Sequence, residues 1–182
     1  MSPIEILWIT LTLVFGFVGM ARGYPRELGV TTMALIGIWV LGQLVQPGLK
    51  FLDSQVGAAV GIRVTEGPNG DLIQFLAHAV IFLLIIFASY AGETFSFPGR
   101  PRKGRIGSLI SFGNGLLNGY LINGTIWYYL DRFGYPLQRW GLVQPQLSQT
   151  AQQIVKYLPP QVIDRTVLMG IIAIMLLLRV RK

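Results

Sequence analysis

Four long stretches without a charged residue constrain this 182-residue chain more than any other feature. They are residues 6–21, 28–49, 72–92 and 106–130, and they contain 16, 22, 21 and 25 residues. A helix needs about 20 predominantly apolar residues to cross a hydrocarbon core of about 30 Å. Only 13% of the residues are charged, whereas a soluble domain carries about a quarter. The stretches therefore predict an integral membrane protein, an all-α bundle with four core transmembrane helices.

A shorter apolar stretch lies near the carboxyl terminus. Residues 166–178 carry no charge, and a helix over residues 162–180 would be about 28 Å long. We expect this segment to form a fifth crossing, with a re-entrant or interfacial helix as the alternative. The chain then divides into a four-helix membrane domain at residues 1–130, an extramembrane segment at 131–160 and this helix within 161–182.

The extramembrane segment contains one apolar stripe at helical spacing. Its members are Leu147, Ala151, Ile154, Val155 and Leu158. A helix with this pattern buries one face and leaves the other polar. We expect the helix to lie in the membrane surface, and packing against the bundle is an equally good interpretation.

The charge distribution predicts orientation rather than nucleic-acid binding. The chain has 15 Lys and Arg against 8 Asp and Glu, and the bases lie between the apolar stretches, where they contact lipid headgroups. Nine of the bases lie in segments on one side of the five crossings and six on the other, so the positive-inside rule predicts an outer amino terminus and a cytoplasmic carboxyl terminus. The first stretch has no preceding base, unlike a cleavable signal peptide, and is expected to remain as an anchor.

The turn between the first two stretches carries a compact motif. Its members are Gly19, Arg22, Gly23, Arg26 and Glu27. Glycines four residues apart let helix backbones approach closely, and Gly23 and Pro25 are expected to break the helix between residues 22 and 27. Composition favours an interfacial hairpin with an Arg–Glu pair. The functional alternative is that the two arginines bind lipid phosphate or an acidic group of a partner.

The fourth stretch combines small residues with asparagines. Small residues recur every fourth position, at Gly107, Ser111, Gly115 and Gly119. The amides are Asn114, Asn118 and Asn123. Close backbone contact and hydrogen bonds hold membrane helices together, so packing within the chain or between copies is the favoured interpretation. A polar lining for a substrate path is the alternative.

His78 is the one ionisable side chain inside a predicted crossing. It is a candidate ligand for haem or chlorophyll or a member of a proton relay, although such a residue more often hydrogen-bonds a neighbouring helix. One histidine and no cysteine exclude thiolate, iron–sulfur and multi-histidine metal sites. No nucleophile–base set and no phosphate-binding loop is recognisable. We therefore expect no catalysis, no metal and no cofactor.

These motifs resemble the colicin V production protein family of bacterial inner-membrane proteins. Its first hairpin has an acidic residue near the amino terminus, an apolar helix and then G-x-x-R-G-x-x-R-E, which appears here from Gly19 to Glu27. Glu5 stands where the family usually has Asp, and Asn118 stands in a glycine ladder where the family often has a base. The resemblance covers residues 1–130. It implies a non-enzymatic scaffold or accessory in toxin production and secretion or in envelope homeostasis, which contacts itself or another membrane protein.

Two further functions remain open from the residues alone. The asparagines of the fourth stretch suit a small channel or transporter. The apolar helices equally suit a structural subunit of a larger respiratory or photosynthetic complex in the membrane.

Overall fold

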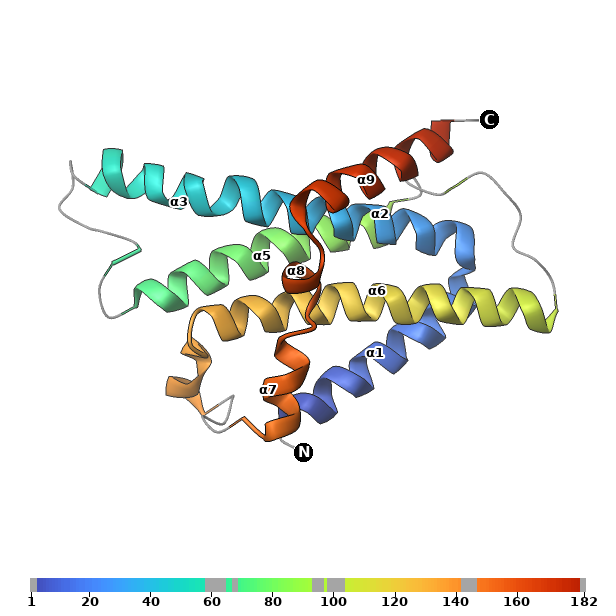
Figure 1. Ribbon diagram of the computed structural model, residues 1–182, viewed down its shortest axis with the longest axis horizontal. Helices are drawn as coiled ribbons and strands as arrows, with labels where there is room; N and C mark the ends of the chain where they lie inside the picture. Colours follow the sequence, from blue (N-terminus) through green and yellow to red (C-terminus); the bar gives the residue numbers. More distant parts are fainter. Residues whose placement is uncertain are drawn as a thin grey trace.

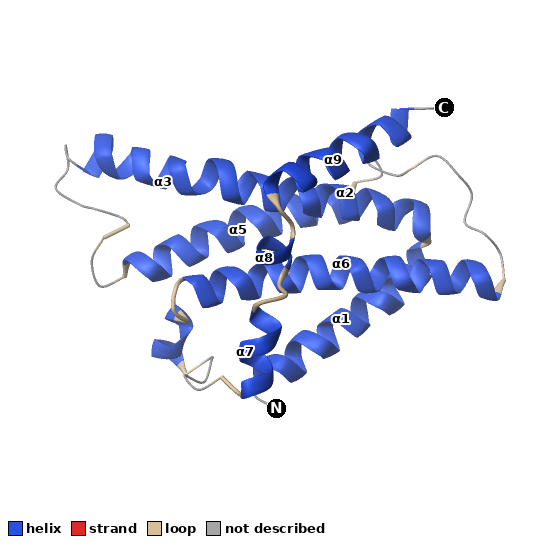
Figure 2. Cartoon of the chain, viewed as in Figure 1, coloured by secondary structure: helices blue, strands red, loops and turns tan. Residues whose placement is uncertain are grey.

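The computed structural model describes residues 3–57, 65–66, 69–92, 97, 104–141 and 147–180 (Figure 1). Its α-helices are α1 (Pro3–Arg22), α2 (Tyr24–Val40), α3 (Gln46–Leu52), α5 (Gly70–Ala91), α6 (Arg105–Arg132), α7 (Gln149–Val155), α8 (Pro159–Val162) and α9 (Arg165–Val180). Two π-helical segments, η1 (Leu41–Val45) and η2 (Asp53–Gly57), continue α2 and α3, and η3 (Pro136–Trp140) is a 3-10 turn. No strand occurs in these ranges (Figure 2), so the all-α prediction is confirmed.

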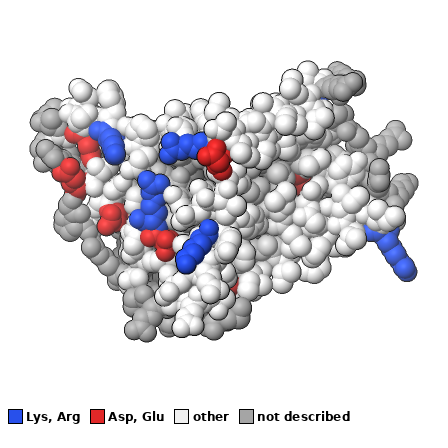
Figure 3. All heavy atoms as spheres, in the orientation of Figure 1, with Lys and Arg blue, Asp and Glu red and all other residues white. Residues whose placement is uncertain are grey.

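Three helical segments are long and apolar enough to cross a membrane. They are α1, the rod Tyr24–Gln55 and α5. Their outer faces carry large exposed apolar side chains, for example Phe17 on α1 and Phe87 on α5. In Figure 3 the charged side chains gather over one half of the visible face, and a broad uncharged area separates them from a base at the opposite end. The prediction of membrane-spanning helices is supported for these three segments. The fourth and fifth crossings remain predictions.

Helix α6 lies in the middle of the bundle. It packs against α1, α2 and α5, and α7 and α8 lie against it as well (Figure 1). Leu121, Ile122 and Trp127 are among its buried side chains. Because other helices rather than lipid cover much of α6, this helix tolerates the glycines and asparagines that make it less apolar than its neighbours.

The turn between α1 and α2 is shorter than the sequence suggested. Gly23 alone makes it, with a φ of 85°, a conformation that glycine adopts without steric cost. Pro25 does not break the helix, so that expectation is wrong: it lies in the first turn of α2, where the missing N–H of proline has no helical partner in any case. The two helices therefore meet at a single residue.

The apolar stripe of the 131–160 segment faces the protein. Ala151, Val155 and Leu158 are buried in the core, and Leu147 and Ile154 pack partly against it. The helix itself, α7, is only seven residues long. Ser148 caps it by accepting a hydrogen bond from the Ala151 N–H, and the Ser148 hydroxyl donates to the buried carboxylate of Glu5. This contact attaches α7 to the first turn of α1.

Helix α9 begins later than the expected segment, at Arg165 instead of residue 162. Asp164 sets this start, because the Thr166 N–H donates to Asp164 Oδ1 at 2.8 Å. At 16 residues the helix is about 24 Å long. Leu168 is its one buried residue, and α2 is the helix it chiefly contacts. Beyond this contact, α9 projects from the bundle (Figure 1).

Six of the bases counted for orientation lie outside the described residues: Arg63, Arg100, Arg102, Lys103, Arg181 and Lys182.

Candidate functional site

Arg22 and Glu27 of the hairpin motif belong to a polar cluster between the helices. The Glu27 carboxylate is fully buried, and its Oε1 lies 3.0 Å from Arg22 Nε in an ion pair. Asn118 of α6 donates from Nδ2 to Glu27 Oε2 at 2.8 Å and to the Glu27 backbone oxygen at 3.0 Å. The carboxylate of α2 is thus held by a cation from α1 and an amide from α6.

Two further residues complete this hairpin cluster, which we define as Arg22, Glu27, Thr31, Tyr90 and Asn118. The Thr31 hydroxyl donates to Asn118 Oδ1 at 2.7 Å. The Arg22 guanidinium lies over the Tyr90 ring, 4.4 Å from its centroid, and Nη1 donates to the Tyr90 backbone oxygen at 3.2 Å. The cluster therefore joins four helices, α1, α2, α5 and α6. Arg26, the second base of the motif, is exposed at the start of α2.

Three small residues of the fourth stretch, Ser111, Gly115 and Gly119, lie in the contact between α6 and α1. All four, Gly107, Ser111, Gly115 and Gly119, are buried. A Cβ atom on Gly19 of α1 would lie 2.8 Å from the Gly115 Cα, and one on Gly119 would lie 2.8 Å from the Thr12 Cα, distances that real Cβ atoms essentially never show. Ser111 accepts a hydrogen bond from the Tyr24 N–H at 3.0 Å. This face is covered by a helix of the same chain.

The three asparagines do not act as one group. Asn118 belongs to the hairpin cluster, whereas Asn114 and Asn123 are half-buried at other positions along α6. The Asn123 Nδ2 has no hydrogen-bond partner in the described part of the chain. None of the three lines the pocket described next.

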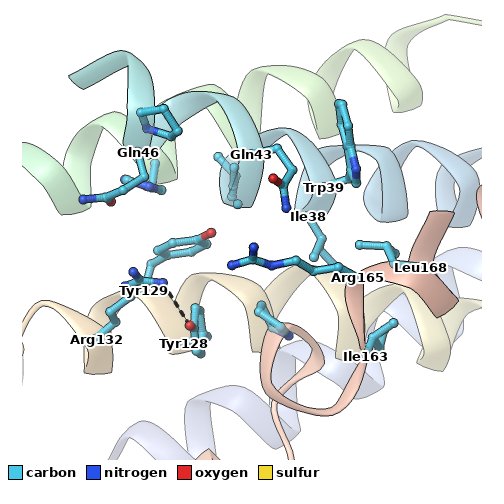
Figure 4. A pocket seen from close by; sticks show the side chains of 15 residues that line it. Ile38, Trp39, Gln43, Gln46, Tyr128, Tyr129, Arg132, Ile163, Arg165 and Leu168 are labelled. Atoms are coloured by element: carbon cyan, nitrogen blue, oxygen red, sulfur yellow. Dashed lines mark hydrogen bonds between the residues drawn. The ribbon is translucent and has the colours of Figure 1, made fainter. Parts of the chain in front are cut away.

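A pocket of about 330 Å³ lies where η1, α5, α6 and α9 meet (Figure 4). Its buried wall includes Ile38, Leu41, His78, Tyr129 and Leu168. Its polar rim consists of Gln43, Gln46, Arg132 and Arg165. We call this site the arginine pocket.

The two arginines of the rim come from distant parts of the sequence. Arg165, at the start of α9, extends across the pocket toward Tyr129 (Figure 4). Arg132, at the end of α6, donates from Nη1 to the Tyr128 hydroxyl at 3.1 Å. Neither guanidinium forms an ion pair within the described ranges, and no Asp or Glu is among the residues that line the pocket. The pocket lining therefore carries two positive charges and no negative one.

His78 contributes an unpaired acceptor to the buried wall. Its Nδ1 lies 2.7 Å from the Gln74 backbone oxygen on its own helix, which accepts only, so Nδ1 carries the proton. Nε2 is buried and has no hydrogen-bond partner among the described residues. The ring packs on Tyr129 with centroids 4.4 Å apart. The residues that the structure describes contain no group of three possible metal ligands.

The polar residues Gln43 and Gln46 line the pocket from an irregular segment of the helical rod, in η1 and directly after it. Pro47 lacks the N–H that the Gln43 carbonyl would accept from in a regular helix. The chain responds with the wider π-helical turn η1 just before it. The Gln46 Nε2 donates to Gln74 Oε1 at 3.2 Å, and its own Oε1 has no partner among the described residues.

Sequence reasoning missed several residues of both sites. Gln43, Gln46 and Pro47 interrupt an apolar stretch, and this signal was available. Arg132 and Arg165 are 33 positions apart on segments read as separate units, so no local pattern links them. Thr31 and Tyr90 lie inside predicted crossings and have no signature of their own.

Over the described residues the fold is all-helical, with three helical segments long and apolar enough to cross a membrane. No protein-family model matches the chain, and no curated protein and no solved structure matches it.

Proposed function

We propose that this chain is a non-enzymatic scaffold or accessory protein of the bacterial cytoplasmic membrane, as its resemblance to the colicin V production proteins implies. The observation that carries the proposal is the hairpin cluster. Arg22 and Glu27 of the shared motif form an ion pair and Asn118 donates to Glu27, and with Tyr90 they join four helices into one frame. A frame of this kind presents its outer faces to lipid and to other membrane proteins.

The proposed topology has five crossings, α1, the α2–α3 rod, α5, α6 and α9, with the amino terminus outside. Support comes from the arrangement of the helix ends: the α1–α2 turn, the end of α5, the start of α6 and the end of α9 lie at the same end of the molecule (Figure 1). Arg22, Arg26, Arg105 and Arg179 belong to this end. By the positive-inside rule it faces the cytoplasm.

Helix α9 is the proposed contact with a partner. It has one buried residue, and large apolar side chains along its length are exposed. These include Val167, Met169, Ile174, Leu177 and Val180. Helices in lipid associate through packing of such surfaces rather than through exclusion of water. A second copy of the chain or another membrane protein would bury this surface.

The test is the composition of the complex after mild solubilisation. A photo-crosslinking residue at Leu177 on α9 should give a stoichiometric protein adduct, either a dimer of the chain or one defined partner. The matched position is Phe87 on α5, which is 71% exposed against 70% for Leu177 and should react with lipid alone. A monomer without a stoichiometric partner, and equal labelling at both positions, would contradict the proposal.

A further inference from the structure

We propose that the arginine pocket binds a phosphate ester that carries a free hydroxyl group, the chemistry of a glycerophosphate headgroup. The proposal is independent of the scaffold function. It rests on three properties of the pocket: two arginines without a carboxylate in the lining, the unpaired acceptors and the apolar side next to α9.

The first property selects an anion. Arg132 and Arg165 reach one pocket of about 330 Å³ from different helices, without a carboxylate among the lining residues. The planar guanidinium group has donors spaced to bind two oxygens of a phosphate at once. Two cations that line one pocket repel each other, and an anion bound between them would remove that repulsion. The pocket volume lies at the lower end of the range of ligand sites, about 300–1,000 Å³.

The second property selects a hydroxyl on the same ligand. His78 Nε2 and Gln46 Oε1 both belong to lining residues and have no hydrogen-bond partner among the described residues. Both atoms are buried, and His78 is 0% exposed, so a ligand hydroxyl reaches them only when these side chains turn toward the pocket. With the proton on Nδ1, the His78 Nε2 atom accepts only, as does an amide oxygen. A buried acceptor without a donor costs free energy. A fully ionised phosphate oxygen supplies no donor, whereas the hydroxyls of a glycerol group do.

The third property places the site at the boundary between polar and apolar surroundings. Trp39, Ile163 and Leu168 line the side of the pocket near α9, while Gln46 and Arg132 lie toward its other side (Figure 4). From Leu168 onward, α9 exposes apolar side chains. A lipid headgroup in the pocket would therefore have acyl chains along α9. A soluble glycerophosphate would use the same polar groups, and the two sources are separated by experiment.

The binding test uses the full chain in a non-ionic detergent after lipid removal. Native mass spectrometry measures retention of phosphatidylglycerol against zwitterionic phosphatidylcholine, and calorimetry measures glycerol 3-phosphate and inorganic phosphate. We expect one phosphatidylglycerol per chain, bound about tenfold or more tightly than phosphatidylcholine. The double variant Arg132→Gln, Arg165→Gln should weaken this binding at least tenfold. The matched variant Arg105→Gln changes an exposed arginine away from the pocket and should have no effect.

The hydroxyl is tested with a ligand that lacks it. Phosphatidylmethanol has the same diester charge as phosphatidylglycerol and no free hydroxyl. The wild-type chain should prefer phosphatidylglycerol about tenfold, and His78→Phe, which keeps a ring against Tyr129, should reduce that preference while phosphatidylmethanol still binds. This comparison in the wild-type chain requires no variant to fold.

Each outcome decides the proposal. Arginine-dependent binding of phosphatidylglycerol alone identifies a lipid headgroup, and arginine-dependent binding of glycerol 3-phosphate identifies a soluble source. Binding that Arg105→Gln weakens as much as the double variant is general attraction of anions and overturns the proposal, as does the absence of arginine-dependent binding. An equal affinity for phosphatidylmethanol and phosphatidylglycerol in the wild-type chain overturns the assignment of the hydroxyl.

Discussion

The hairpin cluster and the arginine pocket are built from the same kinds of side chain and have opposite states of pairing. In the hairpin cluster, the Arg22 guanidinium faces the Glu27 carboxylate, and both ends of the Asn118 amide form hydrogen bonds. In the pocket, Arg165 faces no carboxylate, and the Gln46 oxygen has no partner among the described residues. Polar groups that satisfy one another stabilise a bundle, whereas polar groups held apart remain available to a ligand.

The two regions also differ in how tightly their helices are attached. The α1–α6 contact brings backbones together at glycines, and the cluster adds hydrogen bonds between four helices. On the other side of the molecule, α9 is held to the bundle through Leu168 near its start. Changes in the first region should therefore unfold the whole bundle, and changes in the second should loosen α9 alone.

The largest effect is expected for Gly115→Ala. The added Cβ would overlap the backbone of Phe15 and would lie 2.9 Å from the Gly16 Cα, so α1 must move away from α6. Thermal unfolding in mild detergent should show a loss of about 3 kcal/mol. Gly113→Ala is the matched control, because nothing lies within 4 Å of its added Cβ; it should be neutral or stabilise by up to about 1 kcal/mol. Equal effects of the two variants would show that the α1–α6 contact is not close.

Breaking the ion pair comes next. Glu27→Gln leaves the partly buried Arg22 without its counter-charge and should cost about 2 kcal/mol in free energy of unfolding, less than the 3–5 kcal/mol of a fully buried pair because Arg22 is 23% exposed. The double variant Arg22→Leu, Glu27→Leu removes both charges and should lose less stability than the sum of the single variants Arg22→Leu and Glu27→Leu. Additive losses in this cycle would indicate that the two side chains do not interact.

A smaller loss is expected for Asn118→Leu. The substitution removes the donor to Glu27 and the acceptor for the Thr31 hydroxyl, and should cost about 1–2 kcal/mol. Asn114→Leu, one turn earlier on α6 and outside the cluster, should have little effect on unfolding. If both variants unfold alike, asparagine position on α6 does not matter for stability.

Leu168→Ala tests the weaker region. Truncation of the one buried side chain of α9 should release that helix without unfolding the bundle, a local effect of about 2 kcal/mol. Hydrogen exchange should become faster in residues 165–180 and remain unchanged in α1 and α6. Faster exchange throughout the chain would mean that α9 supports the whole fold.

The smallest effect concerns the exposed cap of α9. The hydrogen bond from the Thr166 N–H holds the pKa of the Asp164 carboxyl below its ordinary value. The cap therefore contributes stability above the pKa of the unfolded chain, and this contribution is lost as the pH falls through the lower pKa of the folded chain. Amide exchange at the first turn of α9 should quicken over this acidic range, after correction for intrinsic rates. Asp164→Asn, which caps without titrating, should remove the pH dependence.

Much of the fold was predictable because membrane crossing depends on local composition. Charge-free stretches set the approximate limits of the long helices, and their apolar character indicated a lipid-facing protein. The wrong predictions concern the starts of helices. Pro25 begins a helix instead of ending one, and α9 starts at Arg165 because of a side-chain cap that hydropathy does not register.

The sites were predictable only in part, because the sequence reveals local patterns and not contacts between distant segments. The hairpin motif lies within nine consecutive residues, so its members were found together. The partner of Glu27 is Asn118, 91 positions away, and spacing alone could not connect the two. The pocket joins Gln46, Arg132 and Arg165 from three segments that the sequence treats separately.

The amino-acid order by itself determined which stretches become long apolar helices, because a helix satisfies its backbone hydrogen bonds internally, whatever packs against it. Only the packing of those helices decided which polar groups meet a partner and which do not. Complementarity between side chains is a property of distances in space, and a guanidinium such as that of Arg22 or Arg165 carries the same charge whether or not a carboxylate lies beside it.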